Sequence, residues 1–74
     1  MKVVIQRVLE AKVEINKEIA GQIGKGLLLY VCFETDDNLD SVQTACEKIS
    51  KLRIFEDEKG RMNKSILDVQ GSIL

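Results

Sequence analysis

Apolar and polar residues alternate along the first part of the chain in the way that β-strands require. The run Val3-Val4-Ile5 opens an apolar segment that continues to Val8, and this pattern predicts a strand. Val13 and Ile15 then alternate with charged neighbours, which predicts a second, half-buried strand. The chain is therefore expected to begin as a β-sheet.

A hairpin is expected to follow this sheet segment. Asn16-Lys17 supplies turn residues, and residues 18–23 have the pattern of a returning strand. The glycines Gly21, Gly24 and Gly26 indicate bends or a close approach of the backbone. Their spacing is not GxGxxG and a strand follows them, so hairpin glycines that allow positive φ explain them better than a phosphate-binding loop.

The middle of the chain predicts one central strand and one helix. Residues 27–33 are apolar throughout and too short for a membrane, which is typical of a strand covered on both faces. Thr35-Asp36-Asp37-Asn38 is rich in residues that cap helices. Apolar residues then recur at helical spacing, namely Leu39, Val42, Ala45, Cys46, Ile49 and Leu52. We expect one main helix at about residues 38–52, with its apolar stripe on the sheet.

The last third of the chain is irregular. Leu52-Arg53-Ile54-Phe55 predicts a strand, residues 57–60 a turn with Gly60 in a left-handed conformation, and residues 61–65 a short return. Gly71-Ser72-Ile73-Leu74 has the pattern of a strand that is only beginning. The elements together predict a mixed α/β fold of the α+β-like kind in a single unit, residues 1–74, cut within an element.

A chain of this length can build only a thin core. Folding of a domain of 74 residues buries about 60% of the surface that the unfolded chain exposes. The apolar gain minus about 1.5 kcal/mol of ordering entropy per residue comes out near zero unless a disulfide, a metal or a partner chain adds support. Cys32 and Cys46 lie in apolar runs and are interpreted as buried free thiols, and without His or a CxxC motif no metal site is expected.

The chain is close to electrically neutral. Eleven basic and twelve acidic residues give a net charge of −1, which disfavours a protein that grips nucleic acid through many phosphates. Contact with the end of an RNA needs few phosphates and is compatible with this charge. The start of the chain does not resemble a signal peptide and no apolar run approaches the roughly 18 residues of a membrane span, so we expect a cytoplasmic location without a membrane partner.

Side chains suited to catalysis are scarce. Because the chain has no His, no hydroxyl or thiol can be activated in a Ser-His-Asp arrangement. The candidate nucleophiles are expected to be structural: Ser41, Ser50, Ser65, Ser72, Thr35, Thr44, Cys32 and Cys46. Asp36-Asp37 and Glu56-Asp57-Glu58 are interpreted as a helix start and a charged turn in preference to metal ligands or acid-base pairs.

Arg7 is the side chain with the most open interpretation. By alternation it falls on the same side of the first strand as Val3 and Ile5, which are expected to face the core. One interpretation is an arginine whose stem packs while its head reaches water at the rim of the sheet. The other is an arginine that holds backbone carbonyls or another segment in place.

Four stretches of the sequence together resemble the D-aminoacyl-tRNA deacylase (D-tyrosyl-tRNA deacylase) family. They are Ile5-Gln6-Arg7-Val8 with Ala11 and Val13, Ile23-Gly24-Lys25-Gly26-Leu27-Leu28, the long run from Leu52 to Asn63, and Asp68 before Gly71. The run from Leu52 to Asn63, with its fixed turn, is the most specific of these stretches. Cys32 is a departure, because members of the family usually have Gly there.

The resemblance implies a layered β/β/α fold, a homodimer, and hydrolysis of the ester that joins a D-amino acid or glycine to the 3′ end of tRNA, without cofactor or metal. In that family main-chain amides around a Ser-Gln-Phe-Thr motif surround the ester, and a Gly-cis-Pro element of the other subunit excludes L-amino acids. Both motifs are expected beyond Leu74. Of the family's functional positions only Arg7 carries over, as a side chain that helps to fix the Gly-cis-Pro element, with Gln6 as a weaker candidate.

Two other classes of function remain open from the sequence. A non-catalytic module could fold through dimerisation and act as a structural or interaction piece. A small β-rich RNA binder is disfavoured by the neutral charge and by the few aromatic residues, since Tyr30, Phe33 and Phe55 lie in runs expected to form the core.

Overall fold

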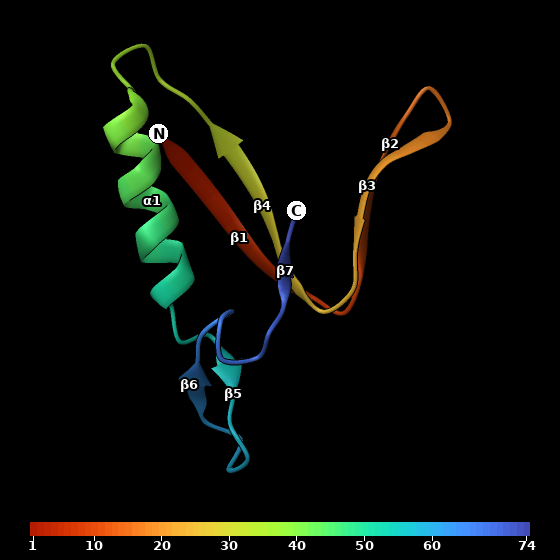
Figure 1. Ribbon diagram of the computed structural model, residues 1–74, viewed down its shortest axis with the longest axis vertical. Helices are drawn as coiled ribbons and strands as arrows, with labels where there is room; N and C mark the ends of the chain where they lie inside the picture. The colour runs from red at the N-terminus through yellow and green to blue at the C-terminus, as the bar shows by residue number, and fades with distance from the viewer.

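The computed structural model describes residues 1–74 as seven strands and one helix (Figure 1). The elements are β1 (Lys2–Val8), β2 (Ala11–Ile15), β3 (Glu18–Ile23), β4 (Gly26–Cys32), α1 (Leu39–Lys51), β5 (Phe55–Glu56), β6 (Met62–Lys64) and β7 (Ser72–Ile73). They form a three-stranded sheet in the order β1-β4-β7 and two hairpins, β2-β3 and β5-β6. The predicted mixed α/β fold with one main helix is confirmed.

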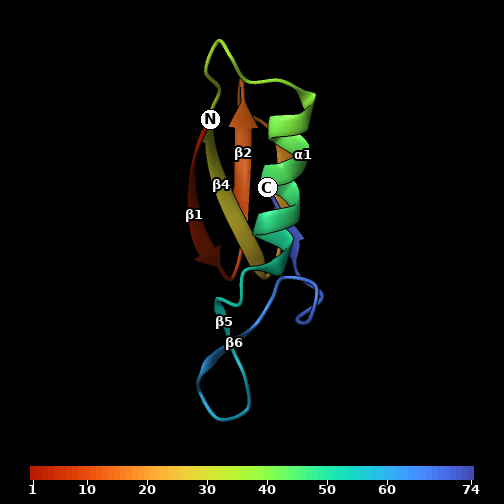
Figure 2. The same cartoon turned by 90° about the vertical axis from the view of Figure 1, so that its left-hand side faces the viewer.

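The three-stranded sheet is the frame of the molecule. Strands β1 and β4 pair antiparallel from Lys2↔Cys32 to Val8↔Gly26, and β7 lies parallel on the other side of β4. The helix α1 runs alongside this sheet in a separate layer (Figure 2). No helix of the structure is long and apolar enough to span a membrane.

The hairpin β2-β3 forms an arm that stands apart from the rest of the molecule (Figure 1). Its turn is the predicted one, since Asn16 and Lys17 both have positive φ, as a two-residue hairpin turn requires. The prediction of a half-buried strand is wrong here, because Val13 and Ile15 are 43% and 59% exposed. The strand itself is present as predicted, but little of the chain covers the arm: Leu74 lies against Gly21, and Val13 and Ile15 are left exposed.

The core is small and lies on one face of the sheet. Leu27, Phe55 and Ile66 are its buried hydrophobic side chains. Partly buried side chains from the sheet, the helix and the last turn pack around them, namely Ile5, Leu29, Ile49, Ile54 and Val69. The core therefore joins four segments that are far apart in the sequence.

Several expectations about burial are corrected by the structure. The strand β4 is covered only in its first half, because Leu27 is fully buried whereas Tyr30 and Phe33 are 59% and 62% exposed. Cys32 and Cys46 are exposed free cysteines, so the interpretation as buried thiols is wrong. The predicted strand at residues 52–55 begins only at Phe55. Tyr30, Phe33, Cys32 and Cys46 thus lie in apolar stretches of the sequence and are nevertheless exposed.

The helix α1 is capped as its sequence predicts. The Asn38 side chain accepts a hydrogen bond from the Ser41 backbone amide at 2.9 Å, and the Ser41 hydroxyl accepts one from the Asn38 amide at 3.4 Å. No residue of α1 is fully buried and Leu39 is 80% exposed, so the apolar stripe lies on the core mainly through Ile49. The helix covers less of the sheet than the sequence suggests.

For Gly21, Gly24 and Gly26 the expected positive φ is wrong, whereas the expected close approach of the backbone is found at Gly26. Gly60 is the only glycine with positive φ, at 75°, so the explanation by positive φ is wrong for Gly21, Gly24 and Gly26. A close approach of the backbone explains Gly26, because a Cβ atom there would lie 1.8 Å from the carbonyl oxygen of Ser72. The parallel pairing of β7 with β4 therefore requires glycine at this position.

The N-terminal amine ties β1 to the loop before the helix. It donates a hydrogen bond to Asp37 Oδ1 at 3.2 Å and lies 3.0 Å from Asp37 Oδ2 and 3.6 Å from Glu34 Oε1. The hydrogen bond to Asp37 raises the pKa of the amine above 8.0. The Glu34 backbone amide, followed by the N-terminal amine, lowers the pKa of Asp37 below 3.8.

Replacing Gly26 with Ala is expected to weaken the docking of β7. The added methyl group collides with the Ser72 backbone, and overpacking of this kind costs about 1–3 kcal/mol. Thermal unfolding and amide exchange at Leu27 and Leu74 measure the effect. Gly24→Ala is the control, since nothing lies within 4 Å of the Cβ position at Gly24. Equal stability of the two variants would contradict the role of Gly26.

Acetylation of the N-terminal amine is expected to lower the melting temperature near pH 6. The amine's raised pKa means that its contribution is complete below pH 8.0 and is lost as the pH rises through the folded-state pKa. The lowered pKa of Asp37 means that its contribution is complete above about pH 4 and is lost on acidification. Melting curves of the acetylated and free chains should converge at pH 11. In an Asp37→Asn background, acetylation should have little effect at any pH.

Candidate functional site

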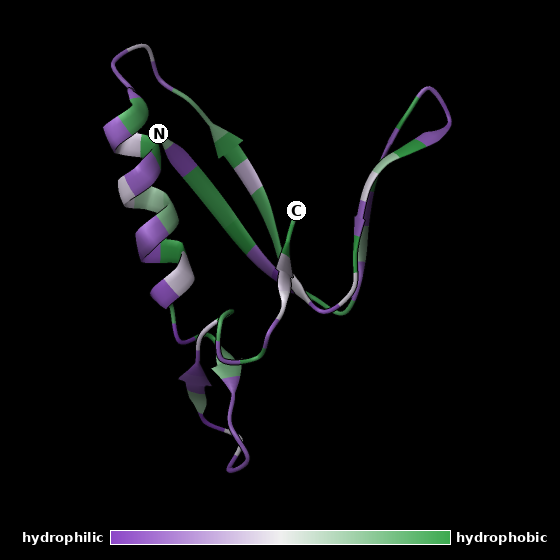
Figure 3. Ribbon diagram, viewed as in Figure 1, coloured by the Kyte–Doolittle hydropathy of each residue, from purple (hydrophilic) through white to green (hydrophobic).

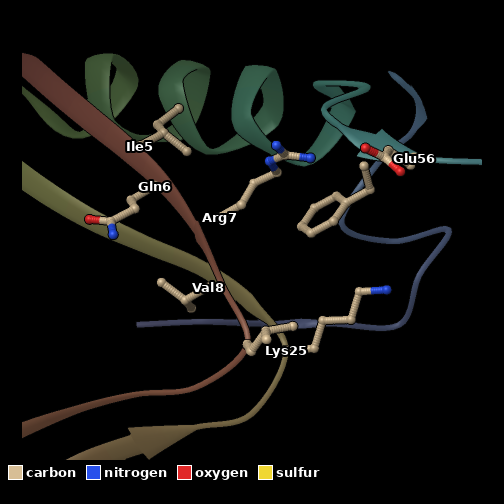
Figure 4. Close-up of a pocket in the computed structure, with 8 residues that line it drawn as sticks. Ile5, Gln6, Arg7, Val8, Lys25 and Glu56 are labelled. Atoms are coloured by element: carbon tan, nitrogen blue, oxygen red, sulfur yellow. The ribbon is translucent and has the colours of Figure 1, made fainter. Parts of the chain in front are cut away.

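An open pocket of about 560 Å³ lies at the end of β1 (Figure 4). Its lining comes from three parts of the chain: Ile5, Gln6, Arg7, Val8 and Leu9 from β1 and its end, Lys25 from the segment before β4, and Phe55 and Glu56 from β5. The pocket therefore combines an apolar floor with side chains of both charges.

The sheet register and the core bring these segments together. The pairing of Val8 with Gly26 places Lys25 beside the end of β1. Phe55 is 4% exposed and belongs to the core, so its ring is fixed. The Lys25 ammonium lies 5.9 Å from the centroid of that ring, within the range of a cation–π contact.

Arg7 reaches into the pocket from the same face of β1 as Ile5. In Figure 4 its side chain points from β1 toward the segment that carries Glu56. The guanidinium Nη1 donates to the Met62 sulfur at 3.4 Å, and a thioether is a weak acceptor. The ion pairs of the chain involve the amine of Met1, Lys12 and Lys64, and none includes Arg7.

The structure places Arg7 at the rim with an exposed head, which is the first of the two interpretations that the sequence left open. Val3 and Ile5 on the same face are half-buried, and the sheet is left uncovered beyond them. The guanidinium is held by one weak contact and keeps most of its donors unpaired. It can therefore bind a carbonyl or an anion that enters the pocket.

Gln6 also lines the pocket but takes no part in the same arrangement. Its side chain points away from the guanidinium of Arg7, as alternation along a strand requires (Figure 4). It is exposed, and none of the side-chain hydrogen bonds of the structure includes it. The two residues predicted from the sequence therefore lie in one pocket but face opposite ways.

The hydroxyl groups of the chain have structural roles or lie outside this pocket. Ser41 belongs to the helix cap, and the Ser50 hydroxyl donates to the Glu47 carbonyl at 2.8 Å. Ser65 is buried and its hydroxyl accepts from the Asp68 amide at 3.2 Å, while Ser72 belongs to β7. None of these serines lines the pocket, whose charged side chains are Arg7, Lys25 and Glu56.

In the acidic stretch Glu56-Asp57-Glu58, Asp57 and Glu58 have the structural roles expected at a charged turn. Asp57 accepts hydrogen bonds from the backbone amides of Lys59 and Arg61 at 2.8 and 3.0 Å, and the Arg61 amide is the main cause of its lowered pKa. Glu58 pairs with Lys64 at 2.9 Å, which lowers the pKa of Glu58 and raises that of Lys64. No group of three or more His, Cys, Asp or Glu side chains is gathered to hold a metal ion.

Sequence reasoning missed Lys25, Phe55, Glu56 and Met62 as neighbours of Arg7. Phe55 was identified only as a core residue, and Lys25 only as part of a glycine-rich turn. Their proximity follows from the pairing of β1 with β4 and from the packing of β5 on the core. No local pattern in the sequence marks this proximity, because register and packing join residues that are far apart along the chain.

Comparison with known proteins gives the family of this chain. The family model described as D-Tyr-tRNA(Tyr) deacylase matches residues 4–74. Because the match covers nearly the whole chain, the chain belongs to this family.

Individual relatives agree with this assignment. The D-aminoacyl-tRNA deacylases of Lactobacillus gasseri and Exiguobacterium sibiricum are 53% and 51% identical over all 74 residues. The solved structure of the c-Myc DNA Unwinding Element Binding Protein matches 99% of the chain with a TM-score of 0.91 and 36% identity. The chain spans 51% of each of these two deacylases and 50% of the solved chain, which is about half their length.

Removal of the Arg7 side chain is expected to leave the fold intact. Arg7 is exposed and makes one weak contact, and substitutions of this kind change stability by about 0.5 kcal/mol or less. Thermal unfolding of Arg7→Ala tests this, with Phe55→Ala as the destabilising comparison from the same pocket. A loss of stability close to that of Phe55→Ala would make Arg7 a structural residue.

Proposed function

We propose that the chain is the N-terminal half of a single D-aminoacyl-tRNA deacylase domain. In this proposal the complete domain hydrolyses the ester that joins a D-amino acid or glycine to the 3′ end of tRNA, and so proofreads mischarged tRNA. The observation that carries the proposal is the family match over residues 4–74, together with relatives of about 50% identity along the whole chain.

The reaction class fits the chemistry available. An aminoacyl ester lies next to a ribose hydroxyl, and it can hydrolyse without a side-chain nucleophile if amides stabilise the oxyanion and hold the reactants in place. The absence of His from the chain is compatible with such a site. In this mechanism the residues described here provide the sheet that positions the reacting segment, and the reacting segment itself lies in the other half of the domain.

Arg7 is the residue to which we assign a supporting role. Its guanidinium is exposed in a pocket, has a single weak partner and is not neutralised by an ion pair. Such a group can hold the backbone carbonyls of the Gly-cis-Pro element that, in the resemblance, comes from the partner subunit. Gln6 is a weaker candidate because it faces the other way, and no cofactor is part of the proposal.

A homodimer in the cytoplasm is part of the same proposal. The small core leaves much apolar surface exposed, which association would cover. With a net charge of −1 the chain is suited to touching the aminoacylated end of tRNA and not to tracking a long stretch of phosphates. The same charge disfavours broad nucleic-acid binding of the kind that the name of the structural neighbour suggests for that protein.

A second candidate is a catalytically inactive dimerisation or structural piece of the same fold. It is favoured by one observation, that the chain spans only about half the length of the deacylases it matches. Activity measurements distinguish this candidate from the first.

A fusion of this chain to the second half of the Lactobacillus gasseri deacylase tests the function. The fusion should deacylate D-Tyr-tRNA and Gly-tRNA and leave L-Tyr-tRNA intact, whereas residues 1–74 alone should not exceed the buffer rate. Release of amino acid from labelled tRNA measures both. An inactive but folded fusion would contradict the proposal, and turnover by residues 1–74 alone would contradict the assignment of the chemistry to the other half.

In the same fusion Arg7→Ala should lower kcat/KM about 10- to 100-fold or relax the discrimination against L-Tyr-tRNA, because a displaced segment misplaces the ester. Arg7→Lys should keep part of the activity and discrimination that Arg7 provides, since lysine keeps the charge but loses the forked geometry of the guanidinium. Arg53→Ala is the matched control, because Arg53 is exposed and does not line the pocket. Equal behaviour of the Arg7 and Arg53 variants would remove the assignment.

A further inference from the structure

The chain exposes far more surface than a compact protein of its size. Its accessible surface is 5943 Å², whereas a compact folded chain of 8.3 kDa exposes about 4,600 Å², an excess of about 1,300 Å². The Cα radius of gyration is 13.8 Å against about 11 Å for a compact domain of this length. Only 5 of 74 residues are buried. This excess surface must lie on particular faces of the fold.

Part of this surface is the face of the main sheet that points away from the core. Ile5, Leu27 and Leu29 pack on the core side, so their neighbours along the strands point to the opposite face. There Val4 and Tyr30 lie opposite each other in the β1–β4 pair and are 63% and 59% exposed. Figure 3 shows the apolar character of both strands. We call this surface, centred on Val4 and Tyr30, the outer face.

One edge of the same sheet is also open. β7 pairs with Gly26 and Leu27, and the last bond on this edge runs from the Leu29 amide to the Leu74 carbonyl at 2.8 Å. Backbone groups of alternate residues point to the same edge of a strand, so those of Val31 come next on this side. No strand lies beside Val31 there, although β4 continues to Cys32. The open edge is therefore next to the outer face.

The comparisons identify what fits this surface. The relatives and the solved neighbour are about twice as long, and the neighbour matches this chain with a TM-score of 0.91 over half its own length. The fold of the described half is therefore kept when a second half is present. The excess of about 1,300 Å² also includes the arm, so it is the upper limit of what the outer face and its edge contribute, and permanent interfaces bury about 1,000 Å² or more on each partner.

We propose that the outer face and the open edge at Val31 together bind the second half of a deacylase domain, and that this chain takes up that half when it is supplied as a separate polypeptide. The new strand adds to the sheet parallel to β4, in the direction that β7 already has. A second copy of this chain would instead pair antiparallel with this edge, because like edges related by a two-fold axis run in opposite directions. The proposal rests on membership of the family and does not require that the assembled domain be active.

The test mixes residues 1–74 with the second half of the Lactobacillus gasseri deacylase made as a separate polypeptide. Native mass spectrometry and size-exclusion chromatography should show assemblies with equal numbers of the two polypeptides. The first half of the Lactobacillus gasseri protein, with the same second half, is the reference pair. If the reference pair assembles and this chain does not, or if neither pair assembles, the proposal is overturned. Assemblies that contain only copies of this chain overturn it as well.

Two variants locate the binding surface. Tyr30→Glu places a charge on the outer face and should weaken binding about tenfold or more. Val31→Pro removes the backbone N–H donor at the open edge, while the backbone groups of Tyr30 and Cys32 that face β1 remain. It should weaken binding as strongly as Tyr30→Glu. Leu39→Glu is the control, since Leu39 is 80% exposed at the start of α1, and it should change binding by no more than about twofold.

Amide exchange of β1 and β4 in the unbound variants reports whether each still folds, and Tyr30→Glu leaves every backbone donor in place. Unchanged binding by folded Tyr30→Glu and Val31→Pro overturns the proposed surface. A complex that forms but does not release D-tyrosine from tRNA leaves the docking surface standing and counts against the proposed function alone. The two proposals therefore fail separately.

Discussion

The contact on which this fold depends is the approach of β7 to Gly26. A backbone carbonyl can lie against β4 at this point only because Gly26 has no side chain. The approach allows the Ser72 amide to donate to the Lys25 carbonyl at 3.1 Å and the Leu74 amide to donate to the Leu27 carbonyl at 3.0 Å. It also draws the preceding turn inward, so that Ile66 joins Leu27 in the core. Without this parallel pairing the last ten residues would have no fixed place.

The turn before β7 is built to deliver the strand in one register. The Ser65 amide donates to Asp68 Oδ2 at 2.9 Å, which is the main cause of the lowered pKa of Asp68, and the Asp68 amide donates back to the Ser65 hydroxyl. Gln70 has a φ of 52° and ends the turn, and the Gly71 amide donates to the Ile66 carbonyl at 3.1 Å. Buried Ser65, its reciprocal hydrogen bonds with Asp68, and Gln70 in the left-handed conformation thus follow one another along the chain and lead into β7.

The local sequence pattern predicted the strands and the helix better than it predicted which of their side chains are buried. Apolar runs predicted β1 and β4, alternation and the Asn16-Lys17 turn predicted β2 and β3, and the period of 3.6 with Asn38 predicted α1, because these signals depend on neighbours in sequence. Burial could not be read in the same way, since Tyr30 and Cys46 have the apolar context of a core and yet are exposed. The pocket could not be predicted from the sequence for a similar reason. Arg7 could be placed on a face of β1, but Lys25 and Phe55 join it only through sheet register and packing.

The arm formed by β2 and β3 has a consequence for how the main sheet assembles. Strands β1 and β4 meet at Val8 and Gly26, so their pairing must close the segment of residues 9–25. When the β2–β3 hairpin has already zipped from its turn, only residues 9, 10, 24 and 25 remain flexible. Because the flexible segment is shorter, the entropic cost of closing the loop falls by about 1 kcal/mol. The exposed arm thus favours an order of events in which the most local contacts form first and the main sheet closes onto them.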